Sequence, residues 1–567
     1  MKHAIRTFLQ FDKPYQRFEL LETEPHGIPS FFARREEKRA HFRKESGTLS
    51  KRLDRNEAWL KALFHAEVNT DLILRRFTIG GQVRAIAASM NGMADDKQIA
   101  DFILRPAFHV ETDGVPNRQL PTFFCENALS MDETERTESR ERTAQAITEG
   151  RTAILIDGAG EAILCDTRGF VSRPVGEPQN EMTIMGPKEA FTENIRTNVT
   201  LLRRILKRPD FVCEFRSSGG TNGTQLVLAY LDGTVNPTLL NEVKRRLDTI
   251  STDMRLTVGR VEQLIEDYTY LPLPQMLKTE RPDRAASAVL DGRIALLLEG
   301  CPQAGVLPIT VGTLLMSGED MDMRQPVGTV VLMIRMIGAL LSTYLPAYFL
   351  ALALHHPGQL SGEILETVVA SRAMVFLPLW MEMIFLLLVF QLVREAGLRV
   401  PGSIGHAIGI IGGLLLGQAA VSANIVSTVV LIIVALTGLG NFAIPDYSAQ
   451  IAASYYRVLL CVAATLAGLL GITVTGLCVT AVMCSVKSFG VPFFAPFSPV
   501  TKHAEYLLFL CGTRMNALIP EIQKAASYAS GAAVTRDDID KTVNRLPEAD
   551  VFAMTDALSR RNYDGAA

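Results

Sequence analysis

Residues 327–354 read VGTVVLMIRMIGALLSTYLPAYFLALAL, an apolar run in which Arg335 is the one charged residue. Three more apolar blocks follow it, at 373–393, 404–445 and 458–486. Each block can supply the roughly 20 apolar residues that a membrane-spanning helix requires. We therefore predict that the C-terminal half of the chain is an all-α polytopic membrane domain.

The predicted membrane domain extends over residues 323–515, and the block lengths allow about four to six spans. Its orientation follows from the loops, because cytoplasmic loops carry an excess of Lys and Arg. The loop at 355–371 has neither residue, whereas the next loop, at 394–403, has two arginines. We therefore expect the N-terminal half and the C-terminal tail to be cytoplasmic.

Composition and motifs exclude several classes of protein. The chain of 567 residues has a formal net charge of −3, which provides no basic footprint for nucleic acid. It contains no GxxxxGK phosphate loop and no GxSxG or HExxH motif. Its eight cysteines are dispersed, without the spacing of metal ligands. We expect neither an enzyme nor a protein with a metal or another cofactor.

The N-terminal half has the charge distribution of a soluble protein and contains a diverged repeat. The segment DLILRRFTIGGQVRAIAASMNGMADDKQIADFIL, from residue 71, has two β-like runs, an Asn-Gly turn at 91–92 and a helical pattern. The segment DFVCEFRSSGGTNGTQLVLAYLDGTVNPTLLNEVKRRL, from residue 210, repeats this order with an Asp-Gly turn at 232–233. The repeated order indicates two similar structural units.

A second pair of motifs has the same spacing. EGRTAILIDGAGEAILC (149–165) matches DGRIALLLEGCPQAGVL (291–307), with Arg151 aligned to Arg293 and Gly158 to Gly300. Because both pairs recur at an offset of about 140 residues, we predict two related α/β modules. The predicted domains are a charged N-terminal tail (1–60), the first module (61–178), the second module (179–322), the membrane domain (323–515) and the C-terminal tail (516–567).

The two modules are joined by GPKEAFTENIRTNVTLLRRILKRPDF (186–211), whose apolar residues recur at helical spacing. The opposite face of this helix is basic, with Arg196, Arg203, Arg204, Lys207 and Arg208. One interpretation is a helix packed on the modules. The other is a docking face for a partner or a lipid headgroup.

The predicted membrane blocks contain four notable polar residues, Arg335, Glu382, Gln418 and Asn424. Glu382 is the charged position in FLPLWMEMIFLLL (376–388), and we expect it near the middle of the second span. An ionisable residue at this depth is costly unless it faces a partner or water. Either Arg335 and Glu382 form a buried ion pair, or one or both line a hydrated path for ions. The two amides likewise require a partner or water.

The last apolar block ends in SVKSFGVPFFAPFSPV (485–500), which Gly490, Pro492, Pro496 and Pro499 interrupt. Proline cannot continue a helix, and broken backbone at membrane depth must be shielded by protein or line a cavity. We therefore expect a break or re-entrant element near a gate or a membrane boundary.

Seven motifs, in their order along the chain, resemble the A subunits of the GerA family of spore germinant receptors. They are NTDLILRRFTIGG, EMTIMGPKEAFTENIRTNVTLLRRILK, DGRIALLLEGCPQAGVLP, YLPAYFLAL, REAGLRVPGSIG, GLLLGQAAVSANIVS and KSFGVPFFAPFSP. Together they cover roughly residues 69 to 500. The residues that carry the resemblance include Gly186, Pro187, Glu193, Arg196, Asn198, Arg394, Glu395, Gly397, Pro401, Gly490, Pro492, Pro496 and Pro499.

The resemblance implies a multi-pass protein of the spore inner membrane that works with a transporter-like B subunit and a lipoprotein C subunit in nutrient sensing. It also implies self-association into a nutrient-gated ion channel whose opening triggers germination. Three departures from the family pattern, ASMNG, PFFAP and CGTRMNALIPEIQ, leave a sister branch open. That alternative is a non-conducting membrane modulator of germination, of the stage V sporulation protein AF type.

Overall fold

The computed structural model describes residues 47–495 and residue 498, except for short gaps. The gaps are residues 111–114, 132, 170–175, 177, 179–180, 182–185, 219–222, 251–254, 322, 324, 400–416 and 496–497. The chain forms two compact units, one of residues 1–318 with 334–501 and one of residues 319–333 with 502–567. Most of the predicted N-terminal tail, the C-terminal tail, Pro401, Pro496 and Pro499 lie outside the described residues.

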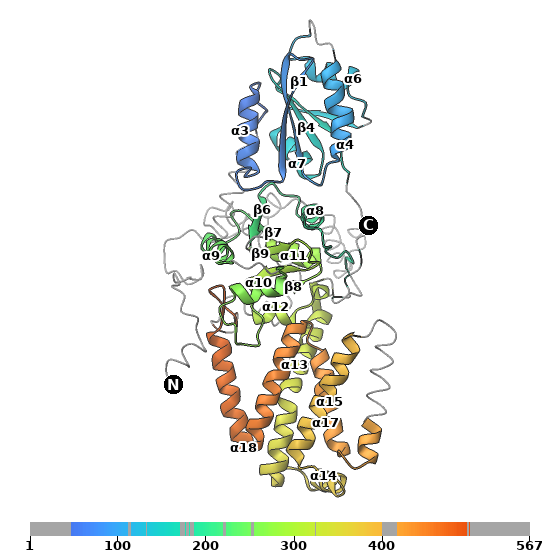
Figure 1. The fold of residues 1–567 in the computed structure, drawn as a ribbon, viewed down its shortest axis with the longest axis vertical. Helices are drawn as coiled ribbons and strands as arrows, with labels where there is room; N and C mark the ends of the chain where they lie inside the picture. Colours follow the sequence, from blue (N-terminus) through green and yellow to red (C-terminus); the bar gives the residue numbers. More distant parts are fainter. Residues whose placement is uncertain are drawn as a thin grey trace, which may run out of the picture. The chain divides into compact units, whose positions relative to one another are not determined.

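The first module is a five-stranded antiparallel sheet with helices on both faces (Figure 1). Its strands are β1 (Leu72–Ile79), β2 (Val83–Met90), β3 (Thr134–Thr137), β4 (Thr152–Ile156) and β5 (Ala162–Cys165), in the order β1-β2-β4-β5-β3. One face packs on α3 (Leu53–Leu63) and α7 (Arg140–Thr148). The other packs on η1 (Ile99–Leu104), α5 (Arg105–His109) and α6 (Leu120–Asn127), with the short α4 (Asp96–Gln98) before them.

This two-sided covering explains why β4 is apolar at almost every position. Successive residues of a strand point to opposite faces. Leu155 belongs to the layer of α3 and α7, whereas Ile154 belongs to the layer of η1, α5 and α6. Helix α3 begins within the predicted charged tail, and its Leu53 and Leu60 are buried in the first of these layers.

The second module repeats this arrangement. Its strands are β6 (Phe211–Ser218), β7 (Thr224–Leu231), β8 (Leu277–Thr279), β9 (Ile294–Leu298) and β10 (Ala304–Leu307), in the order β6-β7-β9-β10-β8. One face packs on α8 (Ile195–Ile205) and α11 (Pro282–Leu290), and the other on α9 (Pro237–Asp248) and α10 (Val258–Ile265). The short elements α12 (Val311–Leu315) and η2 (Gly318–Met321) follow β10.

Equivalent hydrogen bonds support the relation between the modules. Asn56 of α3 accepts the N–H of Ser50 at 2.9 Å and donates to its carbonyl oxygen at 2.7 Å. Asn198 of α8 makes the same pair of bonds with Thr192, at 2.7 and 2.6 Å. In each module, an asparagine in the leading helix therefore holds the chain that enters it.

The aligned turn glycines also have equivalent roles. Gly158 donates its N–H to the carbonyl oxygen of Lys51 at 2.8 Å, and Gly300 donates to Glu193 at 2.7 Å. Both glycines have a positive φ, 88° and 74°, which a residue with a Cβ rarely adopts. The structure thus confirms the predicted Gly turns and gives the two modules one strand order.

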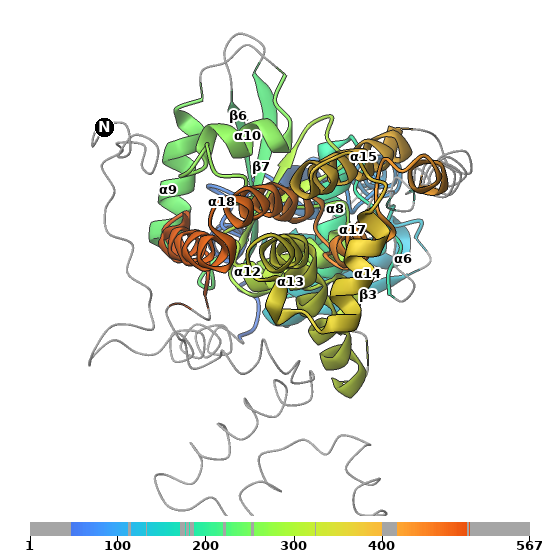
Figure 2. The ribbon, with the colours of Figure 1, turned by 90° about the horizontal axis from the view of Figure 1, so that it is seen from below.

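The C-terminal half is helical. Its helices are α13 (Gln325–His355), η3 (Pro357–Gln359), α14 (Gly362–Arg372), α15 (Leu379–Arg399), α17 (Thr428–Phe442) and α18 (Tyr447–Ser485). Figure 2 shows α13 nearly end-on. Among the described residues, two helices are long and apolar enough to cross a membrane, Val327–His355 and Tyr447–Ser485. Thr428–Phe442 is a shorter apolar helix.

Helix breaks divide the C-terminal half differently from the predicted blocks. Gly468 has φ 59° and ψ −139°, so α18 consists of two limbs, whereas the sequence predicts one span at 458–486. Figure 1 shows these limbs folding back beside one another. The expected loop at 355–371 contains helix α14. A second break lies at Asn424, whose φ is 52°.

Candidate functional site

The segment that follows α18 is a β-hairpin. Strands β11 (Lys487–Ser488) and β12 (Val491–Pro492) pair antiparallel across a turn formed by Phe489 and Gly490. Both turn residues have a positive φ, 50° and 85°, as in the two-residue turns that join paired strands. Of the two predicted alternatives, a break or a re-entrant element, the described residues contain the break. Helix α18 ends at Ser485, before Gly490 and Pro492, and the chain then enters a hairpin that packs on the second module.

Two phenylalanines anchor the hairpin in the second module. Phe489 is 2% exposed and joins the apolar cluster under α9 and α10. Phe493 is fully buried in the cluster under α8 and α11. The hairpin therefore contributes side chains to the cores on both faces of the sheet, and we call it the plug hairpin (residues 486–493).

Hydrogen bonds to backbone groups of the module hold the plug hairpin in place. The Ser488 hydroxyl accepts the N–H of Ile309 at 3.1 Å and donates to the carbonyl oxygen of Gln275 at 2.8 Å. Val311 donates its N–H to the carbonyl oxygen of Phe493 at 2.8 Å. These bonds satisfy polar groups that burial would otherwise leave without partners.

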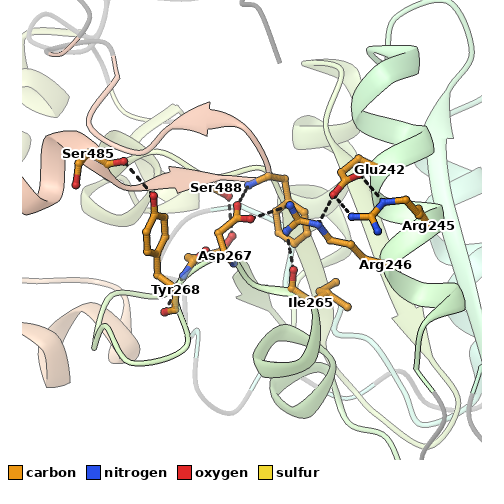
Figure 3. Close-up of polar contacts among 10 residues, drawn as sticks. Glu242, Arg245, Arg246, Ile265, Asp267, Tyr268, Ser485 and Ser488 are labelled. Carbon is orange, nitrogen blue, oxygen red and sulfur yellow. Dashed lines mark hydrogen bonds and ion pairs between the residues drawn. The ribbon is translucent and has the colours of Figure 1, made fainter. Parts of the chain in front are cut away.

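A buried ion pair lies directly behind the turn of the plug hairpin (Figure 3). Arg246, on α9, is 1% exposed and pairs with Asp267 at 2.7 Å. The other oxygen of Asp267 accepts the N–H of Phe489 at 3.1 Å. Arg246 also stacks on the Phe489 ring, with its guanidinium carbon 4.9 Å from the ring centroid, and donates to the carbonyl oxygen of Ile265 at 2.7 Å.

Helix α18 also contacts the second module directly. Its Ala452 and Tyr456 belong to the apolar cluster of α8 and α11. At its other end, the Tyr268 hydroxyl donates to the carbonyl oxygen of Ser485 at 3.3 Å (Figure 3). Both limbs of α18 are thus fixed to the module, the second through the plug hairpin. Few residues separate α18 from its contacts with the module, so a displacement of the module would also move α18.

A carboxyl group with a raised pKa lies beside this joint. Glu266 comes directly before Asp267, and its burial, together with the nearby Glu262 carboxylate, raises the pKa of Glu266 to about 8. Glu262 accepts the N–H groups of Gln275 and Met276, both at 3.0 Å. Ionised Glu266 would add a third carboxylate beside those of Glu262 and Asp267.

Glu382 has structural partners that differ from the predicted one. The residue is fully buried in the first turn of α15 and not in the middle of a span, because Pro378 precedes the start of this helix. One carboxylate oxygen accepts the N–H and the O–H of Ser427, both at 2.6 Å. The other is 3.3 Å from Nε of Arg372. In the described structure Glu382 therefore pairs with Arg372, whereas the sequence suggests Arg335.

The position of Glu382 also explains the break before α17. Ser427 is the N-cap of α17, and its hydroxyl accepts the N–H of Val430 at 3.4 Å. A carboxylate at a helix N-terminus interacts favourably with the free N–H groups and the helix dipole. Glu382 and Ser427 thus join the first turn of α15 to the start of α17 at one buried point.

The other three predicted intramembrane residues occupy different environments. Arg335 is partly buried on α13. Gln418 is exposed on helical residues 417–422, and Asn424 is exposed in the turn that ends them. The amides are thus accessible on the surface of a single chain. Among the contacts described for residues 47–495, none joins Arg335, Gln418 or Asn424 to Glu382.

The basic helix between the modules packs on them. Arg203 of α8 is 3% exposed and binds Asp71 and Asn69 of the first module, at 3.0 and 3.1 Å. This confirms the packing interpretation for that face of the helix. Arg196 is exposed over the Phe215 ring and lines a cavity of about 340 Å³ with Thr70, Asp71, Asn91, Phe215, Arg216, Ser217 and Gln225.

The remaining motif residues have varied positions. Gly186 and Pro187 are exposed, and Gly186 has φ 99°. Arg394 is buried near the end of α15, on which Glu395 is partly buried, and a Cβ on Gly397 would meet no atom within 4 Å. Among the described residues, no group of three or more His, Cys, Asp or Glu side chains could hold a metal ion.

Sequence analysis did not single out Arg246, Asp267, Phe489, Arg372 or Ser427. Phe489 lies in a quoted motif, and its Phe-Gly pair could have indicated a turn. Arg246 and Asp267 resemble other charged residues of the soluble half in sequence. The contact that makes them important is formed with a segment more than two hundred residues later in the chain.

The fold is thus that of a protein with two duplicated α/β modules, the second of which is fixed to a long apolar helix by a hairpin. A sequence model described as "Bacillus/Clostridium GerA spore germination protein" matches residues 58–517. The chain therefore belongs to the GerA family.

Named relatives cover most of the chain. Spore germination protein KA of Bacillus subtilis (strain 168) is 32% identical over 433 residues, which are 76% of this chain and 79% of that protein. Spore germination protein GerLA of Bacillus cereus is 32% identical over 433 residues, 76% of this chain and 87% of that protein. The crystal structure of the N-terminal domain of the A subunit of the Bacillus megaterium spore germinant receptor GerK3 aligns with 46% of this chain and 96% of that domain, at 27% identity and a TM-score of 0.38.

Proposed function

We propose that this chain is the A subunit of a spore germinant receptor in the spore inner membrane. It crosses the membrane several times with its α/β modules in the cytoplasm, and it acts with a transporter-like B subunit and a lipoprotein C subunit in nutrient sensing. Copies of the chain assemble around an axis and form a nutrient-gated ion channel. Membership of the GerA family and the two long apolar helices support this proposal.

The observation that carries the proposal is the attachment of α18 to the second module. Helix α18 ends at Ser485 and strand β11 of the plug hairpin begins at Lys487, so one residue separates the apolar helix from a strand packed on the module. Phe489 and Phe493 are buried in the module, and a buried side chain resists displacement because its removal exposes apolar surface. In the proposal, a rearrangement of the second module is transmitted to α18 and changes the pore.

Pore-lining groups would come from more than one chain. The described residues include two helices long enough to cross a membrane, and in the proposal helices from several copies together enclose the aqueous path. The exposed amides of Gln418 and Asn424 are candidates for its lining, and Arg335 is a third polar candidate. Glu382 acts instead as an intramembrane polar group that fixes α15 to α17.

One observation favours a second candidate function, a non-conducting modulator of the stage V sporulation protein AF type. A ring of carboxylates is a common device for attracting cations into a pore. The Glu382 carboxylate, which would supply such a ring most simply, is bound by Arg372 and Ser427 within the chain.

Ion flux distinguishes the two functions. The purified full chain, reconstituted in liposomes with and without its B and C partners, would be tested for nutrient-dependent release of trapped potassium. Release that requires this chain supports the channel. If spores lacking the chain release potassium normally after nutrient addition, the receptor role is wrong. If release from liposomes persists when only this chain is omitted, the modulator is favoured.

A further inference from the structure

A buried guanidinium group without a hydrogen-bond partner lies near the end of α15. Arg394 is 8% exposed, and its Nε, Nη1 and Nη2 atoms all lack a hydrogen-bond acceptor within the described part of the chain. Its guanidinium carbon is 5.8 Å from the ring centroid of Tyr447, at the start of α18. The ring supports one face of the guanidinium but leaves all of its N–H groups unsatisfied.

A second buried arginine, Arg457, lies near Arg394. Arg457 of α18 is 3% exposed, and its Nη2 donates to oxygens of Ser342, Asn441 and Ser454 at 2.9, 3.0 and 3.3 Å. All three partners are neutral. Nε of Arg457 and Nδ2 of Asn441 have no acceptor among the described residues. Arg394 and Arg457 are also close enough to repel one another electrostatically.

The cluster of Arg394, Arg457 and Asn441 therefore has more hydrogen-bond donors than acceptors, and more positive than negative charge. A buried charge without a counter-ion is strongly unfavourable, and so is each buried donor without an acceptor. The carboxylate of Asp446, one residue before Tyr447, accepts the N–H of Ala449 as the N-cap of α18. The group that is missing must be negatively charged and must present several acceptor oxygens to a planar fork of donors, as a phosphate does.

We propose that Arg394, with Arg457 behind it, binds the phosphate of an anionic membrane phospholipid. The inference rests on the proposed membrane location of the helices. The ring of Tyr447, which lies against Arg394, is exposed, and so are Phe442 at the end of α17 and Tyr455 on α18. Aromatic side chains are enriched at the boundary between the acyl chains and the headgroups. A free phosphate ion has the same headgroup chemistry but would gain nothing from these rings.

The test uses the purified full chain in nanodiscs of phosphatidylcholine, with and without added phosphatidylglycerol, and in delipidated detergent with inorganic phosphate. The thermal unfolding midpoint and the retention of phosphatidylglycerol in native mass spectrometry are the readouts. Arg394→Gln removes the charge, and Arg394→Lys keeps the charge but not the fork. Arg105→Gln is the matched control, because Arg105 is a well-exposed arginine of the first module.

Phosphatidylglycerol should raise the unfolding midpoint of the wild type and of Arg105→Gln, but not that of Arg394→Gln. Its affinity for Arg394→Gln should be about tenfold lower, because a hydrogen bond to a charged group contributes roughly 1.4 kcal/mol or more. If Arg394→Gln does not accumulate, Arg394→Lys should bind with intermediate affinity.

Three results would overturn the proposal. In the first, phosphatidylglycerol raises the unfolding midpoint of the wild type and of Arg394→Gln equally. In the second, inorganic phosphate alone gives the full shift, which identifies a free-anion site. In the third, Arg394→Gln disperses the oligomer while lipid has no effect, which identifies a carboxylate of a second copy. If lipid binds at Arg394 but the chain releases no ions, the lipid site is supported and the proposed channel function is refuted.

Discussion

Arg246 connects Phe489 to the interior of the second module. Its guanidinium lies over the Phe489 ring and pairs with Asp267, which also binds the Phe489 N–H. The turn of the plug hairpin is therefore held by a ring contact and by a hydrogen bond that depend on one ion pair. This relationship makes specific predictions about the stability of the joint.

Phe489→Ala should destabilise the joint by about 3–5 kcal/mol, since it removes a buried aromatic side chain and leaves a cavity. Denaturant unfolding of the purified full chain would measure the loss. The matched control is Phe108→Ala, because Phe108 is 55% exposed, and we expect it to change stability by about 0.5 kcal/mol or less. Equal effects of the two substitutions would contradict the burial of Phe489.

Asp267→Ala should be destabilising by about 1.5–3 kcal/mol, the range for hydrogen bonds to charged groups, because it removes the bonds of this carboxylate to Arg246 and Phe489 while Glu242 still pairs with Arg246 at 2.7 Å. The control is Asp248→Ala. Asp248 pairs with Arg216 at 2.6 Å but is 65% exposed, and an exposed pair contributes about 1 kcal/mol or less. A double-mutant cycle with Phe489→Ala should show coupling, because Asp267 binds the Phe489 N–H. Strict additivity of the two changes would argue against the joint.

Glu382→Gln should lower the stability and abundance of the full chain, because Gln cannot neutralise Arg372. We expect a loss of about 1.5–3 kcal/mol, the range for hydrogen bonds to charged groups. Combining it with Arg372→Met should restore abundance, whereas combining it with Arg335→Met should not. Glu363→Gln, at an exposed site on α14, is the control. Rescue by Arg335→Met alone would favour the ion pair that the sequence suggests.

Stability should fall as pH rises between 4.5, the ordinary pKa of Glu266, and about 8, its pKa in the folded chain. In this window the folded state binds more protons than the unfolded state, so the free energy of unfolding decreases with pH by up to about 1.4 kcal/mol per pH unit. The stability contributed by protonated Glu266 is thus lost as pH rises. Glu266→Gln should flatten this slope in denaturant unfolding, and Glu126→Gln, at an exposed site, should not. An unchanged slope in Glu266→Gln would refute the assignment.

The proposed topology predicts which introduced cysteines an impermeant thiol reagent labels in intact cells. Cys213 is buried and its pKa is raised by burial, so it would resist labelling on either side. In a cysteine-depleted chain, Gln359→Cys, between α13 and α14, should be labelled. Glu126→Cys, in the first module, should be labelled only after permeabilisation. The reverse pattern would place the modules outside the cytoplasm.

The duplicated modules show what the sequence could predict. Gly158 and Gly300 recur because each turn requires a positive φ, and β4 and β9 recur because both are buried on two faces. Strands β3 (TERT) and β8 (LKT) were not predictable in this way. They are short edge strands, and too few residues are present to show a period of two.

The C-terminal half shows where the prediction was wrong. The isolated charge of Glu382 correctly indicates a buried partner, but that partner is Arg372, the last residue of α14, which lies between the expected loop at 355–371 and the apolar block at 373–393. The plug hairpin was misplaced for a similar reason. Phe489 and Phe493 are equally apolar against lipid and against a protein core, so only the tertiary contact with Arg246 and Asp267 determines which environment they have.

The most direct test of the proposed coupling is the rate of potassium release from spores after nutrient addition when two glycines are inserted between Ser485 and Val486. The insertion lengthens the connection between α18 and the plug hairpin but leaves both elements intact. A control chain carries the same insertion between the exposed Gly358 and Gln359. At equal abundance and assembly, we expect the junction insertion to abolish potassium release and the control insertion to preserve it. Release at the wild-type rate from spores with the junction insertion would contradict the coupling.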